Sequence, residues 1–442
     1  MATSWRGNRR AALGLGMASV MAGAVACSSS GGSDQGSGSV KAPSGTLQFL
    51  VSSGDASDKA FRQVNAAFEK KYPKVTVKFS AVPNQNFSAS RSSRLTAKNV
   101  DLTLAQPKEV PGYASGSAES DDSVAADGGL FVDLSNQSFL KRFQPSVMDA
   151  IRYKGKSYTV PTGLSYYTGV FYNKTLFDKY GLKIPTTWSE FQHVVATLKS
   201  KGATPLGIGG KEGWPAGLDM IAAVQSLYPS AKDKQQLTEQ LWKKQVSLAD
   251  GKQLEVLQRV KSLYDAAQKN FPGVSSASIP SEFAAGNFAM TVDGTWNQTT
   301  YAAAVGSKFD FGYFPLPASE NAADNSTLGG KVELRMAVAS NGPNKDAALA
   351  YLDFFSQPDI YKQFVKTSGF APAEPNIPAN AFLKSIAKYT SPFSPAWDTV
   401  WVPNSDAGQA AVYPFNYPAI APMGKGSPEQ AAQEAQKAWT QA

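Results

Sequence analysis

Residues 46–79 read TLQFLVSSGDASDKAFRQVNAAFEKKYPKVTVKF and combine two hydrophobic patterns. The first six residues form a β-rich run, apolar residues then recur at helical spacing up to Tyr72, and Pro73 ends that pattern. Residues 75–79 alternate as a strand does, and residues 102–105 form another short apolar strand. This β-α-β-β order predicts an α/β lobe with a largely parallel sheet.

Polar side chains follow two of these strands. Asp55 comes after the first strand, and Gln106 directly follows the strand at residues 102–105. Ligands of such sheets bind beyond the carboxyl ends of the strands, so both side chains are predicted to face a ligand. The alternatives are a helix cap and a solvated loop.

The rest of the chain continues the mixture of helices and strands. We expect one helical region over 187–228 with Gly/Pro breaks, and helices over 237–267, 345–366 with Gly369 as C-cap, and 428–439. Extended segments are expected at 156–161, 170–173, 288–292 and 311–317. Residues 162–167 are predicted to cross between lobes, and the two prolines of 311–317 suggest a hinge.

Composition narrows the classes of function. The chain has 442 residues, a length that predicts two lobes, and 8 Trp, 17 Tyr and 24 Phe suit a protein that presents flat faces to a ligand. Three arginines of its net charge of +8 lie in residues 1–26, and the +5 that remains is spread out, which argues against nucleic acid as a partner. With Cys27 as the single cysteine and His193 as the single histidine, no disulfide and no His/Cys metal cluster can form within the chain. His193 is expected to be a solvated helix residue, and no metal or cofactor is predicted.

The N-terminal residues have the pattern of an export signal. Three arginines, which include the pair Arg9-Arg10, precede an apolar and small-residue run over 11–26 that is too short to span a bilayer comfortably. The run ends in Ala-Val-Ala before Cys27, which resembles a bacterial lipobox, so we expect residues 1–26 to be removed and Cys27 to carry the lipid. Residues 27–43 are expected to form a flexible tether. The arginine pair leaves the general and the twin-arginine export routes both open.

Four stretches further along the chain form a pattern. They are GVFYNKTLF (169–177) with TWSEF (187–191), FAAGNFAM (283–290) with GTW (294–296), SNGPNK (340–345) with YLDFF (351–355), and SGFAP (368–372). Together they resemble family 1 extracellular solute-binding proteins, which include maltose- and oligosaccharide-binding components of bacterial importers. The resemblance runs from about residue 45 to the C-terminus.

The resemblance implies a fold and a function. The fold would be α/β and periplasmic-binding-protein-like, with two discontinuous lobes joined by hinge strands: 44–163 plus 316–370, and 164–315 plus 371–442. A carbohydrate would bind in the cleft between them, and hinge bending would close the lobes around it. The protein would be a monomer, held at the outer face of the membrane by its lipid, that delivers its solute to the permease subunits of an ABC importer.

Sugar sites combine flat aromatic faces with convergent polar groups, and the resemblance assigns such residues here. Trp296 matches a tryptophan that stacks on a sugar ring, and Trp214 with Glu212 matches an aromatic and an acid that face the cleft. Tyr166 and Tyr167 lie at the expected hinge crossing, and one of them is predicted to face the ligand. Ordinary core packing is the alternative for the aromatic residues.

A second set is weaker. Gly330 and Glu333 match a cleft loop, with a plain surface turn as the alternative. Asp293 is predicted either to contact solute or to cap the turn before Trp296. Trp397 is a further candidate, as is Trp401.

Three other functions remain open. A secreted glycoside hydrolase also needs aromatics and two carboxylates, but the acids here lie in no hydrolase motif. The same fold could carry a peptide, polyol, glycerophosphodiester or iron, although the mostly aromatic, acidic and amide candidates favour a neutral polyhydroxylated solute over an anion. An adhesive surface lipoprotein would show no ligand-dependent closure.

Overall fold

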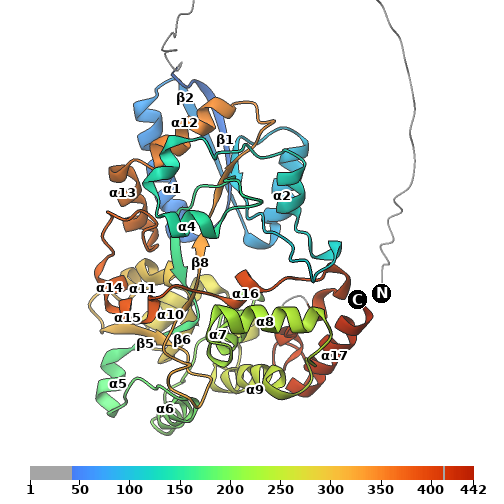
Figure 1. Ribbon diagram of the computed structural model, residues 1–442. Coiled ribbons are helices and arrows are strands. Elements are labelled where there is room, and N and C mark those ends of the chain that lie inside the picture. Colours follow the sequence, from blue (N-terminus) through green and yellow to red (C-terminus); the bar gives the residue numbers. More distant parts are fainter. Residues whose placement is uncertain (1–41, 412–413) are drawn as a thin grey trace, which may run out of the picture. The chain divides into compact units, whose positions relative to one another are not determined.

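The computed structural model describes residues 42–411 and 414–442, and residues 43–442 form one compact unit (Figure 1). The predicted signal peptide, Cys27 and nearly all of the tether lie outside the described residues. No helix within the described ranges is long and apolar enough to cross a membrane.

The first lobe is built on the sheet that the opening stretch predicts. β1 (Gly45–Ser52) lies between β2 (Val75–Val82) and β3 (Leu102–Leu104) and is parallel to both. β9 (Met336–Val338) joins β3 from far along the chain, in the antiparallel sense. The predicted largely parallel sheet is therefore confirmed.

Helices cover this sheet (Figure 1). α1 (Asp55–Lys71) buries Phe61, Val64 and Phe68 and ends before Pro73, as predicted. α2 (Asn84–Thr96) was not predicted, because it buries only Arg91 and Leu95 and has no apolar stripe. The lobe also contains the short helices α3 (Asp121–Asp127) and α4 (Pro145–Ala150).

Two predicted long helices are each divided. The segment 345–366 forms α12 (Lys345–Phe355) and α13 (Pro358–Ser368), because Pro358 cannot continue a helix but starts one well. Gly369 caps α13 with φ +80°, as predicted. The segment 237–267 divides into α8 (Ala231–Trp242) and α9 (Gly251–Ala266), and Lys244 between them has a left-handed φ of 54°.

The second lobe has an antiparallel sheet. β5 (Gly169–Asn173) lies between β6 (Met290–Asp293) and β7 (Phe311–Pro315). The hinge prediction for 311–317 is wrong, since these residues form the edge strand of this sheet and Leu316 N–H continues the pairing to Thr168 O at 3.0 Å. The helices of this lobe are α5 (Lys174–Tyr180), α6 (Trp188–Ser200), α7 (Gly217–Leu227), α8, α9, α10 (Ile279–Ala284), α11 (Gln298–Val305), α14 (Ala381–Ser385), α15 (Ala387–Thr390), α16 (Trp397–Val400) and α17 (Pro428–Gln441).

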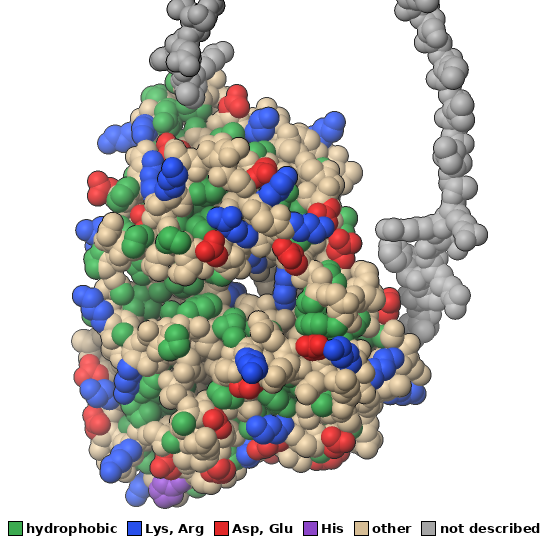
Figure 2. All heavy atoms as spheres, in the orientation of Figure 1, with side chains coloured by type: hydrophobic (Ala, Val, Ile, Leu, Met, Phe, Trp, Pro, Cys, Tyr) green, Lys and Arg blue, Asp and Glu red, His purple; other side chains and the backbone are tan. Residues whose placement is uncertain are grey.

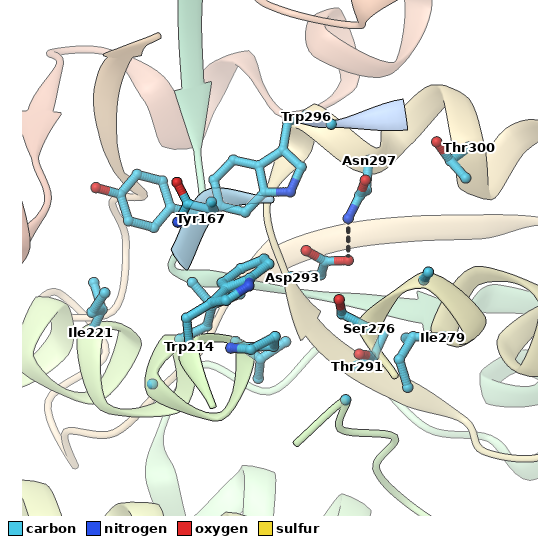
Figure 3. A pocket seen from close by; sticks show the side chains of 18 of the residues that line it. Tyr167, Trp214, Ile221, Ser276, Ile279, Thr291, Asp293, Trp296, Asn297 and Thr300 are labelled. Carbon is cyan, nitrogen blue, oxygen red and sulfur yellow. Dashed lines mark hydrogen bonds between the residues drawn. The ribbon is translucent and has the colours of Figure 1, made fainter. Parts of the chain in front are cut away.

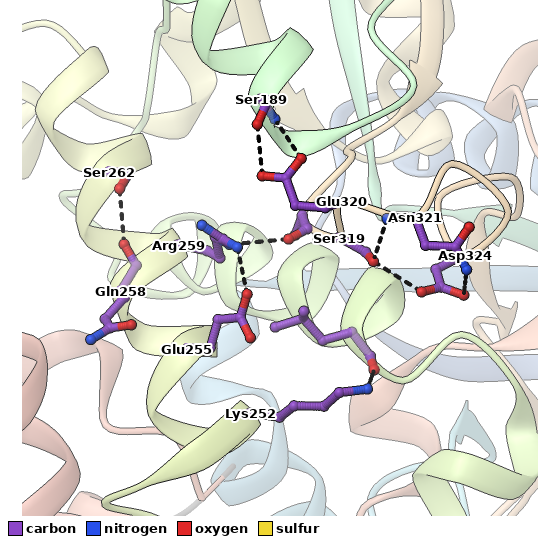
Figure 4. A network of polar contacts seen from close by, with 12 residues as sticks. Ser189, Lys252, Glu255, Gln258, Arg259, Ser262, Ser319, Glu320, Asn321 and Asp324 are labelled. Carbon is purple, nitrogen blue, oxygen red and sulfur yellow. Dashed lines mark hydrogen bonds and ion pairs between the residues drawn. The ribbon is translucent and has the colours of Figure 1, made fainter.

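A polar network holds the segment after β7 to the second lobe (Figure 4). Ser189, in the first turn of α6, donates from its N–H and its hydroxyl to Glu320. Arg259 of α9 donates to Ala318 O at 3.0 Å, and its guanidinium lies over the Trp188 ring at 4.5 Å. The lobe boundary placed at residue 316 is therefore wrong, because the chain stays with the second lobe until β8.

Three segments cross between the lobes side by side. β4 (Gly163–Tyr166) pairs with β8 (Gly329–Glu333), and β8 also pairs with the short β10 (Ser394–Pro395). Leu164 bridges to Ala371 on the third crossing segment. Residues 162–167, which were predicted to cross between the lobes, thus contain one of these paired strands.

Candidate functional site

A cavity of about 400 Å³ opens between the lobes, where the surface is hollowed in Figure 2. The first lobe contributes the end of β1 and the start of α1, and the second lobe contributes α7, β6 and the loops beside them. The crossing segments contribute Lys331, Glu333 and Phe370. Six predicted residues line it, namely Asp55, Tyr167, Trp214, Asp293, Trp296 and Glu333.

Trp296 is the central aromatic of the cavity (Figure 3). Its ring lies 5.3 Å from Tyr167 and 6.4 Å from Trp214, centroid to centroid. It packs against the main hydrophobic cores of both lobes. The ring lies so close over Gly294 that no Cβ fits there, so this glycine is needed to place the indole.

Trp214 supplies the most accessible apolar face, with 38% of its surface exposed. It begins a 3₁₀ turn after Gly213, whose φ of +78° favours glycine. Glu212 does not line the cavity. Its carboxylate accepts from Ser276 N–H at 2.9 Å and from the Ser275 hydroxyl at 2.7 Å, and so positions the loop that carries Ser276 at the cavity wall. Partial burial raises the pKa of Glu212, but these hydrogen bonds outweigh it and the pKa lies below its ordinary value.

Asp293 has the capping role that was one of its two predicted roles. Gly294 N–H donates to one oxygen at 2.7 Å, while Asn297 and the Tyr301 hydroxyl each donate to the other at 2.8 Å. Burial raises the pKa of Asp293 to about 6, and the hydrogen bonds oppose that rise. Asp293 therefore fixes the turn that carries Trp296.

Lys331 is a lining residue that the sequence analysis missed. Its ammonium lies 5.3 Å from the Tyr167 ring centroid and 5.1 Å from that of Trp296. It also pairs with Glu333 at 3.4 Å, and Glu333 accepts from the Ser165 hydroxyl. Residues two apart on a strand share a face, so the predicted Glu333 could have pointed to Lys331.

Two acids of the cavity were also missed. Asp398 accepts from the Tyr167 hydroxyl at 2.6 Å, which orients that ring. Asp219 lies in the first turn of α7 and is only 1% exposed. A single acid within an otherwise almost wholly apolar helix was the available signal for Asp219.

Several predicted residues lie outside the cavity. Tyr166 is buried in the second-lobe core 6.1 Å from Phe393, so of the tyrosine pair it is Tyr167 that lines the cavity. Trp397 is fully buried and stacks on Trp401 at 5.3 Å, so both follow the core-packing alternative.

Gln106 and Gly330 have other structural roles. Gln106 is exposed and accepts from the Arg335 guanidinium at 3.0 Å, which matches the solvated-loop alternative. Gly330 lies within β8, where a Cβ would come within 2.9 Å of the Tyr166 ring. Its absent side chain lets β8 approach β4 closely.

The described residues contain no group of three His, Cys, Asp or Glu side chains arranged to hold a metal ion. His193 is exposed on α6, as expected of a solvated helix residue. The cavity offers aromatic faces, acids, amides and hydroxyls for recognition.

The chain is similar to known proteins of one family. The family of bacterial extracellular solute-binding proteins matches residues 52–362. The multiple sugar-binding protein of Streptococcus mutans is 23% identical over 71% of this chain and 71% of its own length. The melibiose/raffinose/stachyose-binding protein MelE of Bacillus subtilis is 23% identical over 80% of this chain and 81% of its own.

Solved structures show the same fold. RafE in complex with raffinose superposes with a TM-score of 0.75 at 22% identity, over 90% of this chain and 99% of that one. The two lobes, the crossing strands and the family match lead to one conclusion. The chain belongs to the family of bacterial extracellular solute-binding proteins.

Proposed function

We propose that this protein binds a carbohydrate, a mono- or oligosaccharide, in the interlobe cavity and delivers it to an ABC importer. The observation that carries the proposal is the group of Trp296, Trp214 and Tyr167 at one cavity. Flat aromatic faces fit the C–H faces of a sugar, and the acids and amides around them fit its hydroxyls. The relatives named for multiple sugars, raffinose and stachyose support the same class of ligand.

The charges at the cavity favour a neutral solute. Lys331 is the one Lys or Arg among its described lining residues, and Glu333 already pairs with it. The acids Asp55, Asp293, Glu333 and Asp398 outnumber it. An anionic solute such as a glycerophosphodiester would meet repulsion there, so it is the weaker alternative.

The location follows in part from the family. The protein functions outside the cytoplasm, as an extracellular solute-binding protein does. We propose in addition that Cys27 carries a lipid anchor and that residues 27–43 tether the domain to the membrane. The permease subunits of the importer would then meet a monomer near the membrane surface, with no nucleic acid, metal or cofactor involved.

Closure by bending at the crossing segments completes the proposal. The lobes would be 44–163 with the segment from β9 to about residue 370, and the remainder. One tie already joins them, since Lys108 of the first lobe donates to the carbonyls of Thr399, Val400 and Trp401 at 2.8 to 3.0 Å. Burial lowers the pKa of Lys108 to about 8, and the charge of Asp398 opposes that shift.

A thermal-shift screen tests the proposal. Raffinose, stachyose, melibiose, maltotriose and galactose would be compared with glycerol 3-phosphate and a tripeptide. A sugar at about 100 times its Kd should stabilise the native state by about 2.7 kcal/mol, and the anion and peptide should not. Stabilisation by the tripeptide alone would contradict the proposal, as would products from an incubated oligosaccharide, which would indicate a hydrolase.

A further inference from the structure

Asp219 differs from the other buried acids of the cavity in its hydrogen bonding. Asp293 receives three hydrogen bonds from the protein, and Glu333 is held by Ser165 and Lys331. Asp219, the most buried of the three, has an oxygen, Oδ2, that finds no hydrogen-bond partner among the described residues. Among the described residues, no ion pair joins Asp219 to a lysine or an arginine.

The surroundings of Asp219 explain why the protein does not satisfy it. Its neighbours in α7 that also line the cavity are Gly217, Leu218, Met220 and Ile221, none of which has a side-chain donor. The hydroxyl of nearby Tyr264 is used on Ala216 O at 3.2 Å. Burial therefore raises the pKa of Asp219 well above its ordinary value.

An unsatisfied buried polar group destabilises a fold unless something else pairs with it. Asp219 lines the cavity, and although Oδ2 is closed off from solvent in this structure, rotation of the carboxyl would present it to a bound solute that supplies the missing partner. We infer that Asp219 is a specificity-determining residue that receives a hydroxyl of a neutral sugar within the cavity. This inference rests on the proposed function.

A hydroxyl is the group that fits best. A protonated carboxyl donates one hydrogen bond and keeps acceptor capacity, and a sugar hydroxyl both donates and accepts, so the two match without a buried ion pair. An ammonium group, as in an amino sugar, would instead need the ionised carboxylate. A solute without a donor or acceptor at this position would leave Asp219 unsatisfied and bind weakly.

The test compares two substitutions at Asp219 with a matched pair at Glu374. Asp219→Asn retains a donor and an acceptor but no charge, and Asp219→Leu retains the approximate size alone. Glu374 is also a buried acid, 4% exposed, with an oxygen that has no hydrogen-bond partner, but it does not line the cavity. Glu374→Gln and Glu374→Met therefore control for removal of a buried acid as such.

Affinity would be measured by calorimetry with raffinose, stachyose, melibiose, galactose and glucosamine, and melting temperature without ligand. We expect Asp219→Asn to keep the affinity of the best sugar within about threefold and Asp219→Leu to lower it by about tenfold or more. Both should melt no lower than the wild type, and the Glu374 variants should keep wild-type affinity.

Three other outcomes would each contradict a different part of the inference. Equal loss in Asp219→Asn and Asp219→Leu, with glucosamine as the best ligand, would overturn the hydroxyl assignment in favour of a cation. Unchanged affinity in both variants would remove Asp219 from the site while leaving sugar binding intact. A wild type that binds none of the five sugars would refute the proposed function itself, before any variant is made.

Discussion

The two walls of the cavity differ in character. The wall of the second lobe carries Trp214, Trp296 and the buried acids Asp219 and Asp293 on α7, β6 and the turns beside them. The wall of the first lobe consists mainly of Ser52–Ser57, at the end of β1 and the start of α1, together with Asn84, which are small and largely polar; Phe370 is its one buried aromatic among the described residues. One wall is aromatic and mostly buried, while the other is hydrophilic and partly exposed.

This difference indicates a division of labour. Rigid aromatic side chains lose little entropy on binding and can hold a sugar ring before the lobes move. The small polar groups and the free N–H groups at the start of α1 can then bond the outer hydroxyls. Affinity should therefore depend mainly on the second lobe, and closure on contacts between the lobes.

Trp296→Ala should have the largest effect, because it removes the central aromatic face. We expect affinity for the best sugar to fall by at least about 30-fold, or about 2 kcal/mol, as measured by calorimetry. Trp242→Ala is the matched control, since Trp242 packs on Trp439 at 5.4 Å away from the cavity. Equal affinity in the two variants would contradict the aromatic wall.

Lys108→Met should have the next largest effect. It removes the donor to three carbonyls of the second lobe, and hydrogen bonds to charged groups contribute about 1.5–3 kcal/mol each, part of which water restores. We expect faster sugar release and affinity reduced by about tenfold, measured by stopped-flow tryptophan fluorescence. Lys78→Met, at an exposed position on β2, should leave the release rate and the affinity unchanged.

How far the sequence predicted these walls depends on how far apart the contacting residues lie in the chain. The aromatic pair Trp214 and Trp296 stood in motifs, and the sheet of the first lobe followed from one continuous stretch. Lys331 against Tyr167 and Asp398 against Tyr167 join residues that only the folded chain brings together. The local pattern could not show those contacts.

Errors in the elements had local causes. α2 has almost no apolar residues, so its sequence shows no hydrophobic periodicity that would predict a helix. In each divided helix the apolar pattern continues across the break. That continuous pattern led to the prediction of one helix, although Pro358 and Gly251 mark the start of a second one. Glu212 and Gly330 are next to lining residues in the sequence but have structural roles. Glu212 accepts a hydrogen bond from a backbone N–H, and Gly330 allows two strands to approach closely.

Lowering the pH from 7 to 5 should stabilise the native state through Asp293, the acid that fixes the turn of Trp296. The pKa of Asp293 is raised to about 6 in the native state, so between about pH 4 and 6 the native state binds more protons than the unfolded state. The free energy of unfolding should therefore rise as pH falls from 7 to 5, by about 1 kcal/mol from this residue. Urea unfolding would check this, and Asp293→Asn should show a smaller rise. An equal rise in that variant would assign the effect to other acids.

Asp55→Asn should have the smallest effect, because Asp55 is exposed on the hydrophilic wall. We expect at most about a threefold loss of affinity, since an exposed hydrogen bond is replaced by water at little cost. Asp346→Asn, also in the first turn of a helix but away from the cavity, should cause none. A loss as large as that of Trp296→Ala would reverse the proposed order of the two walls.

A crystal structure of the protein with its tightest-binding sugar tests the central claim most directly. The account predicts a sugar ring stacked against Trp296 and Trp214, with a hydroxyl within hydrogen-bond distance of Asp219. The serines at the start of α1 should contact the opposite edge of the sugar. A sugar bound away from the two tryptophans, with the interlobe cavity empty, would contradict the account.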